Sequence, residues 1–274
     1  MAADGVGLRN LRDVGGPVAA GGRRVVHGRL YRSDAPLPGD PAPDLRPWPP
    51  RTVVDLRSPG EALASSHPLE SSQTRIVNIP LLRGLAPGGD PGLRHPESRL
   101  PIADIYGRLL YTSADNLVRV MEAIADGPDP VLLHCAAGKD RTGIAIAVAL
   151  AAVSVDPDSI VEDYKRTEES LEGLLDRLLR GWAVEERAAR LHWLTVERPD
   201  LMLAPVEAIR NVLDALAEWD GGAPGWLLGH GLSETMLERL QAQRQPRVGS
   251  GREGSVDEPT REGGHGNCGR NRPR

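Results

Sequence analysis

A run of 13 almost uniformly apolar residues, 143–155, constrains the fold of this chain more than any other feature. Because the run has no polar face, it must be buried on every side, either in the centre of a domain or in a membrane. A membrane-spanning helix needs about 20 such residues, so the run predicts a central helix of a folded domain. We therefore expect a protein that is not an integral membrane protein.

Short apolar segments ahead of this helix are typical of β-strands. They are 29–32, 52–56, 75–81 and 131–134. The turn formers Ser58-Pro59-Gly60 follow the second segment, and the Asp- and Pro-rich segment 126–130 precedes the fourth. Strands that are apolar throughout are expected in a sheet that is covered on both faces.

The rest of the chain favours helices, through apolar residues at helical spacing and through capping residues. The expected helices include 117–124, 144–153, a helix capped by Asp156 or Asp158 and ending near Tyr164, 171–179, 205–219, and 233–241 with Ser233 as N-cap. Strands first and helices later predict an α/β fold, with a central, mostly parallel sheet flanked by helices and a helix-rich C-terminal half.

Composition separates a folded part from a tail. Residues 244–274 are rich in Gly and Arg and nearly free of large apolar residues, so we expect a disordered tail after a folded domain of residues 1–243. The Gly- and Pro-rich segment 83–101 predicts a functional lid or a disordered insert. The apolar segment 102–110 beside it is either a lid over a site or ordinary core, and core packing is the favoured interpretation.

Charge and cysteine content exclude several classes of protein. A net charge of −5 gives no reason to expect nucleic-acid binding. Two widely separated cysteines do not form a disulfide framework, and the first ten residues do not resemble a signal peptide. We expect a cytoplasmic protein. Export without a signal peptide is left open. Scattered histidines and the lack of an ATP-binding loop predict neither a metal nor a cofactor.

The chemistry of the chain is concentrated where the last predicted strand meets the central helix. Cys135 leaves the strand, and Arg141 lies six positions further on at the start of the helix, with five residues, Gly138 among them, in between. We call this segment the Cys135–Arg141 loop. Its backbone N–H groups can turn inward to form an anion nest, and the helix N-terminus adds its positive end. The segment therefore predicts a phosphate site.

Within such a nest the Cys135 thiolate is favoured over the thiol and becomes a nucleophile. The planar fork of Arg141 can hold two phosphate oxygens at once. The expected phosphate-binding residues are Ala136, Ala137, Gly138, Lys139, Arg141 and Thr142. The Thr142 hydroxyl can also donate to the thiolate, and His134 is expected to orient the loop by hydrogen bonds. The predicted reaction is transfer of a phosphoryl group to sulfur.

The spacing of Cys and Arg is a weak indication when taken alone. Cys268 also has an arginine six positions on, Arg274, in the predicted tail, where no strand precedes it and no helix follows. A buried, inert cysteine is moreover the commonest fate of a free Cys. Only Cys135 combines the spacing with the strand and helix that the chemistry requires.

The stretch His134-Cys135-Ala136-Ala137-Gly138-Lys139-Asp140-Arg141-Thr142-Gly143 resembles the signature loop of the bacterial protein tyrosine phosphatase family that includes mycobacterial protein tyrosine phosphatase B. The similarity extends to Asn10–Gly16, Leu30–Ser33, Val53–Arg57 and Gly221–Leu240. The resemblance covers about residues 8 to 241. It implies a cysteine-phosphatase fold, a catalytic domain within residues 1–243, Cys135 as nucleophile and Arg141 as phosphate binder.

The family resemblance also implies phosphotyrosine as substrate, often with phosphoserine, phosphothreonine or phosphoinositides as well. Lys139, an extra cation in the loop, fits a phosphoinositide phosphatase, although simple solvation of the loop explains it equally well. A phosphate-binding module without catalysis is a third hypothesis, against which the nucleophile and a candidate acid both speak. The expected partner is thus a phosphorylated protein or lipid.

The general acid that protonates the leaving group is the least determined part of the site. A Trp-Pro-Asp loop would supply it, but Trp48-Pro49 is followed by Pro50, and Trp48 is interpreted as a loop anchor. The resemblance favours Asp140. Asp55, at the end of a neighbouring strand, is the second candidate, although it is equally well explained as a cap for Arg57. Asp13 is expected only to fix a turn.

Overall fold

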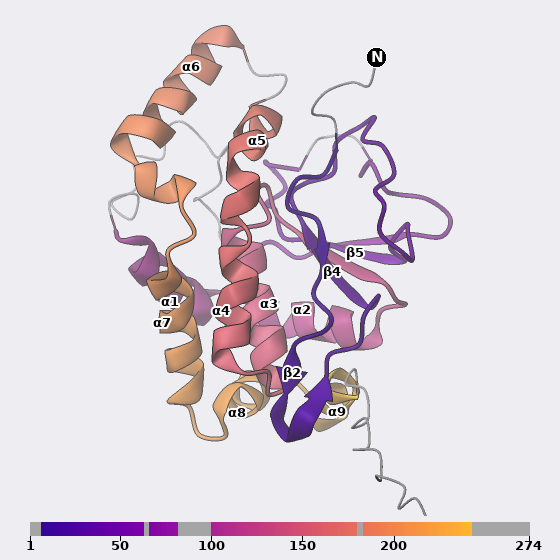
Figure 1. Ribbon diagram of the computed structural model, residues 1–274. Helices are drawn as coiled ribbons and strands as arrows, with labels where there is room; N and C mark the ends of the chain where they lie inside the picture. Colours follow the sequence, from indigo (N-terminus) through magenta and orange to yellow (C-terminus); the bar gives the residue numbers. More distant parts are fainter. Residues whose placement is uncertain (1–6, 63–65, 82–99, 180–182, 243–274) are drawn as a thin grey trace, which may run out of the picture.

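A computed structural model of the chain describes residues 7–62, 66–81, 100–179 and 183–242 and has the α/β architecture predicted from the sequence (Figure 1). The strands are β1 (Arg12–Asp13), β2 (Val18–Ala19), β3 (Arg23–Arg24), β4 (Leu30–Ser33), β5 (Thr52–Asp55), β6 (Arg75–Asn78) and β7 (Val131–His134). The helices are α1 (Ile102–Thr112), α2 (Ala114–Asp126), α3 (Asp140–Ala152), α4 (Pro157–Lys165), α5 (Glu168–Leu178), α6 (Val184–His192), α7 (Val206–Ala217), α8 (Gly222–Gly229) and α9 (Glu234–Gln241). Short helical turns are η1 (Ala20–Gly22), η3 (Trp193–Glu197) and η4 (Pro199–Met202).

Five strands form the main sheet in the order β1-β4-β7-β5-β6. The last four are parallel, and only β1 runs antiparallel to its neighbour β4. The mostly parallel sheet expected from the sequence is therefore confirmed. Because β7 is the middle strand, its carboxyl end opens at the centre of the sheet edge, where ligands of open α/β sheets usually bind.

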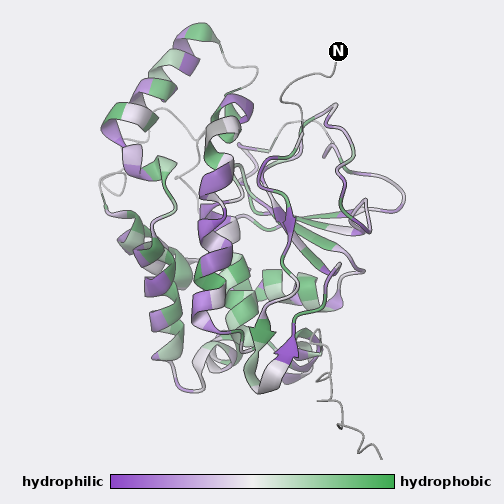
Figure 2. Cartoon of the chain, viewed as in Figure 1, coloured by the Kyte–Doolittle hydropathy of each residue, from purple (hydrophilic) through white to green (hydrophobic). Residues whose placement is uncertain are grey.

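The central helix predicted from the apolar run is α3, which follows β7 directly and is buried along nearly its whole length. It packs against α1, α2, α4, α7, α8 and α9. Figure 2 shows the contrast in hydropathy between α3 and α6, a helix of mixed character that has no buried residue. None of the helices in the described residues combines the length and the apolar character that crossing a bilayer requires.

The two faces of the sheet are covered differently. One face joins the large core around α3, whereas Tyr31, Val53 and Leu132 form a second cluster on the other face. Side chains from connecting segments cover this second cluster, among them Leu45 and Trp48. Trp48 is thus a loop anchor, as predicted.

Several expected boundaries agree with the structure because they depend on local chemistry. Asp156, not Asp158, caps α4 by accepting from the Ser159 N–H at 3.1 Å. The Ser233 hydroxyl accepts from the Met236 N–H and caps α9. The strand expected over 75–81 ends at Asn78. The segments 83–99 and 244–274, expected to be a lid or insert and a tail, lie outside the described residues.

The apolar segment 102–110 belongs to α1, an amphipathic helix that packs against α7. Its apolar face includes Ile105, Leu109 and Leu110, each buried in the main core. The segment 102–110 therefore packs in the core, which is the interpretation that the sequence favoured over a lid.

Candidate active site

Cys135 follows the central strand β7 and is 1% exposed. The next four residues turn the chain into α3, whose second residue is Arg141. Gly138 makes this turn possible, because its φ is +66° and a side-chain carbon there would lie 2.3 Å from the Ser33 carbonyl oxygen. Only glycine fits both the backbone angle and this close approach to the end of β4.

Neighbouring segments hold the Cys135–Arg141 loop by its carbonyl groups. The three contacts run from Ala35 N–H to Ala136 O at 3.0 Å, from Asn10 Nδ2 to Ala137 O at 3.1 Å, and from Arg32 Nη2 to Gly138 O at 2.7 Å. The carbonyl groups are thus turned toward donors on the surrounding scaffold. A loop whose carbonyl groups are bonded outward can turn its amide groups toward an anion.

Arg141 is paired with a carboxylate that the sequence analysis missed. Its Nη1 and Nη2 donate to the two oxygens of Glu61 at 2.7 and 2.8 Å. Glu61 also accepts from the N–H and hydroxyl of Ser58. Burial lowers the pKa of Arg141, but the electrostatic effect of Cys135 and the hydrogen bond to Glu61 raise it by more, so the net shift is upward. The guanidinium is therefore permanently charged.

The same pairing depresses the pKa of Glu61, because the hydrogen bonds and charge of Arg141 outweigh burial, which acts in the opposite direction. A carboxylate bound to both terminal nitrogens of the guanidinium uses the fork that would hold two phosphate oxygens. A bound phosphate would have to share that fork with Glu61 or displace it. The only signal for Glu61 in the sequence is its position after the turn Ser58-Pro59-Gly60.

Asp140, the favoured acid, is the first residue of α3, and its side chain is 38% exposed. Its Oδ1 accepts from the Tyr106 hydroxyl at 2.7 Å. The Lys139 ammonium lies 3.3 Å from the same oxygen. This carboxylate thus reaches solvent while one oxygen is held in place from within the protein, as a group that exchanges protons with a bound substrate requires.

Lys139 is placed differently from the solvent-facing cation that the sequence suggested. It is 2% exposed, and its Nζ donates to the carbonyl oxygens of Leu201 and Leu203 at 2.6 and 2.8 Å. The lysine therefore fastens the segment around η4 to the loop. Thr142 is also buried, and its hydroxyl has no hydrogen-bond partner among the described residues.

His134 is completely buried, and a second histidine, His67, lies against it. The Nδ1 of His134 lies 3.1 Å from the carbonyl oxygen of Cys135, and the two Nε2 atoms are 3.0 Å apart. Burial lowers the pKa of His134 to about 4, so the ring is neutral at physiological pH. The expected role of His134, orienting the loop through hydrogen bonds, agrees with these contacts.

Asp55, the second candidate acid, is bound to Arg57 through both of its oxygens and is 3% exposed. Burial raises its pKa, but His134 and Arg57 outweigh burial, and the net shift is downward. A carboxyl that is buried and held ionised is a poor proton donor. The geometry therefore favours Asp140 over Asp55. Asp13 fixes a turn, as expected, by accepting from the N–H groups of Gly15 and Gly28.

Asp55, His67 and His134 also bring three potential metal-ligand atoms within 4.8 Å of one another. Their hydrogen bonds account for the group without an ion. The Leu69 N–H donates to Nδ1 of His67, so its Nε2 is the atom that carries the proton toward His134. His134 then donates from Nδ1 to the carbonyl oxygen of Cys135, and Arg57 donates to the carboxylate of Asp55. We assign these three residues to the support of the loop.

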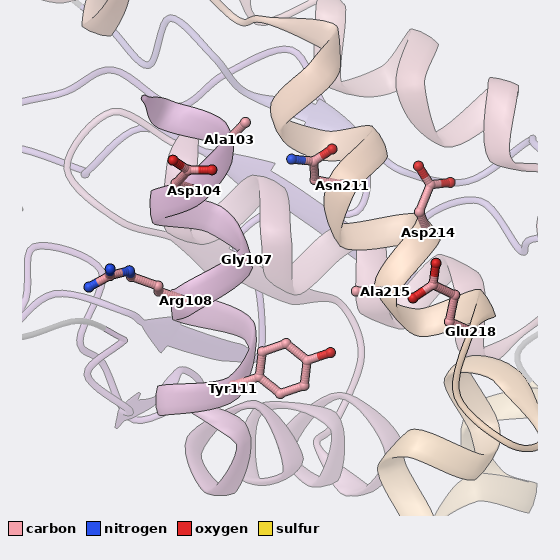
Figure 3. A pocket seen from close by; sticks show the side chains of 9 residues that line it. All are labelled: Ala103, Asp104, Gly107, Arg108, Tyr111, Asn211, Asp214, Ala215 and Glu218. Atoms are coloured by element: carbon pink, nitrogen blue, oxygen red, sulfur yellow. The ribbon is translucent and has the colours of Figure 1, made fainter. Parts of the chain in front are cut away.

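A groove of about 630 Å³ lies elsewhere, between α1 and α7 (Figure 3). Asp104, Asp214 and Glu218 line it together with Tyr111. None of the residues that the sequence predicted for catalysis or phosphate binding contributes to this lining. The three carboxylates outnumber the one arginine of the lining, Arg108, and would repel a phosphate group, so the groove is not part of the candidate active site.

Comparison with known proteins agrees with the resemblance noted in the sequence. A model of the tyrosine phosphatase family matches residues 4–244. The chain is 36% identical over 177 residues to a provisionally named tyrosine-protein phosphatase of Cupriavidus necator. The aligned stretch covers 57% of this chain and 59% of that protein. The chain is also 32% identical over 143 residues to the triple specificity protein phosphatase PtpB of Mycobacterium tuberculosis, and this alignment covers 46% of the chain and 47% of PtpB. The similarity thus spans about half the length of these relatives.

Proposed function

The chain belongs to the tyrosine phosphatase family, and we propose that it hydrolyses phosphate monoesters of the phosphotyrosine type through a phospho-cysteine at Cys135. One observation carries the proposal. Cys135 leaves the middle strand of the sheet, and Arg141 stands in the first turn of the buried helix that follows the loop. This order of strand, loop and helix N-terminus supports a nucleophile, a cation and a nest of amides around one phosphate group.

In the first chemical step, the Cys135 sulfur attacks phosphorus, the S–P bond forms, and the bond between phosphorus and the leaving oxygen breaks. Asp140 gives its proton to that oxygen. In the second step, water attacks phosphorus, Asp140 takes a proton from the water, and the S–P bond breaks. Inorganic phosphate leaves and the thiolate is restored. Arg141 and the loop amides stabilise the charge of the phosphoryl group in both steps.

Dual or broad specificity, with phosphoserine and phosphothreonine as further substrates, is part of the proposal. Among the relatives, the name of PtpB describes a triple specificity phosphatase. The alternative of a phosphoinositide phosphatase depended on Lys139 as a cation for the substrate. The ammonium group of Lys139 instead donates to two backbone carbonyls. That contact weakens the argument for a lipid substrate. A panel of phosphopeptides and phosphoinositides, with phosphate release as readout, separates the two substrate classes.

The chain offers a matched pair of cysteines for the test of the mechanism. Cys135→Ser should lower the rate of hydrolysis of p-nitrophenyl phosphate by about a thousandfold or more, because an alcohol replaces the thiolate nucleophile. Cys268→Ser should keep the wild-type rate. Acid quenching of the reaction with a radiolabelled substrate should trap a phosphoprotein in the wild type and in Cys268→Ser only. A folded Cys135→Ser protein that retains turnover would contradict the proposal.

Asp140→Asn distinguishes a catalyst from a phosphate-binding module. The amide cannot give a proton to the leaving oxygen, so turnover should fall while inorganic phosphate still binds. Equilibrium binding of phosphate and steady-state hydrolysis, measured on the same preparation, provide the comparison. A binding module would show phosphate affinity without turnover in the wild type as well.

A further inference from the structure

Two of the four tyrosines in the chain meet behind Asp140, inside the protein. The Tyr106 hydroxyl, from α1, lies 2.7 Å from Asp140 Oδ1 and 2.8 Å from the Tyr164 hydroxyl, from α4. The two rings meet edge to face, with centroids 6.2 Å apart. Both tyrosines are 1% exposed. Both α1 and α4 contact α3, whose N-terminus carries Asp140 (Figure 1).

The direction of this hydrogen-bond chain follows from counting protons. An ionised carboxylate only accepts, and each phenol has a single proton to give. Tyr106 therefore donates to Asp140, and Tyr164 must donate to Tyr106. Burial and the charge of Asp140 raise the pKa of both phenols, so each keeps its proton throughout the working range of pH. The chain is a fixed donor array that ends on the carboxylate.

The helix packing is shaped to admit this array. Gly143, in the first turn of α3, faces the ring of Tyr164, and a side-chain carbon at Gly143 would lie 3.0 Å from two ring atoms. Because Gly143 has no side chain, the ring of Tyr164 can approach the helix. A buried hydroxyl without a partner costs about 1–3 kcal/mol. Within the part of the chain that the structure describes, both hydroxyls avoid that cost through each other and through Asp140.

We propose that Tyr106 and Tyr164 are positioning residues that fix the carboxyl group of Asp140 for proton transfer. The proposal rests on the proposed function, in which Asp140 protonates the leaving oxygen. Tyr106 determines which oxygen faces inward, and the other oxygen is left for the substrate. Tyr164 acts only through Tyr106, because its proton orients the hydroxyl that contacts Asp140.

The charged and titratable groups around Asp140 determine the effect of losing one of them. Lys139 lies 3.3 Å away on the loop, Arg141 is the next residue on α3, and the two phenols approach from α1 and α4. Of these groups, Tyr106 and Lys139 contact Oδ1 directly. Losing the Tyr106 hydroxyl leaves the orientation of the carboxyl group to Lys139, so proton transfer to the leaving oxygen should slow.

The test is the dependence of the rate on the leaving group. Protonation matters more for a poor leaving group, so Tyr106→Phe should slow the hydrolysis of phenyl phosphate about tenfold and that of p-nitrophenyl phosphate much less. Tyr164→Phe should have a smaller effect of the same kind. In the Tyr106→Phe background it should add nothing, because its contact is already lost.

Tyr31→Phe is the matched control, since it removes a buried hydroxyl that donates to the Pro47 carbonyl instead. It should leave the dependence on the leaving group unchanged. Urea unfolding of each variant establishes that the folded enzyme is compared. A purely structural role of Tyr106 predicts equal losses on the two substrates, and this result overturns the proposal.

Failure of the proposal is distinguishable from failure of the proposed function. If Asp140→Asn shows the selective loss on phenyl phosphate and Tyr106→Phe does not, the positioning role is refuted and the phosphatase mechanism stands. If Asp140→Asn turns over both substrates at the wild-type rate, Asp140 is not the acid and the positioning role falls with it. If Cys135→Ser retains turnover, the proposed function itself is refuted.

Discussion

Replacing Gly138 by alanine tests whether the close approach of the loop to the end of β4 shapes the site. The added carbon would lie 2.3 Å from the Ser33 carbonyl oxygen, 2.5 Å from its carbon and 2.7 Å from the Asp34 nitrogen. All three atoms are backbone, so none can rotate away. Either the loop or the end of β4 must move, and the bond from Arg32 to the Gly138 carbonyl, 2.7 Å long, moves with it.

The expected loss of stability has two parts. A residue other than glycine at a φ of +66° costs about 1–2 kcal/mol. Forcing an extra carbon into a packed region costs about 1–3 kcal/mol more. Gly39 provides the control, because its φ is +85° and an added carbon there would meet nothing within 4 Å. Gly39→Ala should therefore lose only the first part, about 1–2 kcal/mol.

Thermal unfolding of the two variants isolates the close approach. At about 2–4 °C per kcal/mol for a domain of this size, Gly138→Ala should melt about 2 to 12 °C below Gly39→Ala. At a temperature where both are folded, Gly138→Ala should lose about a hundredfold in kcat/KM, because a displacement near 1 Å spoils alignment with the nucleophile. Gly39→Ala should keep its activity. Equal melting temperatures of the two variants would refute the reasoning.

Three further predictions concern the groups that support the loop. Asp163→Asn leaves the buried Arg32 and the partly buried Arg12 without their carboxylate, so urea unfolding should show a loss of about 3–5 kcal/mol, and a loss below 1 kcal/mol would contradict this. Glu61→Gln frees the fork of Arg141 from a competing charge, so inorganic phosphate should inhibit about tenfold more tightly, whereas weaker inhibition would mean that Glu61 only orients the arginine. His134 has its pKa lowered from 6.5 to about 4, so the folded state binds fewer protons and stability should fall as pH drops through that window, by up to about 3 kcal/mol. His134→Asn should flatten that slope in urea unfolding at a series of pH values, and an unchanged slope would exclude His134 as its source.

Elements whose signal is local were predictable from the sequence. The strand 131–134 was predicted with its exact limits, because turn formers precede it and the loop follows it. The central helix follows from its apolar composition, and two helix starts follow from capping side chains. The two-residue strands β1, β2 and β3 are too short to produce a periodic pattern. α8 was also missed, because glycines interrupt its pattern.

The residues of the candidate site also divide into those that the sequence identified and those that it missed. Cys135 and Arg141 were identified because the nest chemistry occupies consecutive residues. Glu61 and Tyr106 were not, because they come from segments far from the loop in the sequence and meet it only through packing. Lys139 shows the converse, since its place in the loop suggested a cation for substrate, whereas its ammonium binds carbonyls of a distant segment.

The sequence by itself determined the parts that depend on neighbours along the chain: a strand, a loop with a nucleophile and a cation, and a helix that must be buried. Tertiary structure alone decided the partners of those groups, namely which carboxylate holds the arginine, which phenols hold Asp140 and which carbonyls hold the lysine. The physical reason is the range of the interactions. Backbone conformation and apolar periodicity act within a few residues, whereas hydrogen bonds and ion pairs form between any groups that the folded chain brings within about 3 Å.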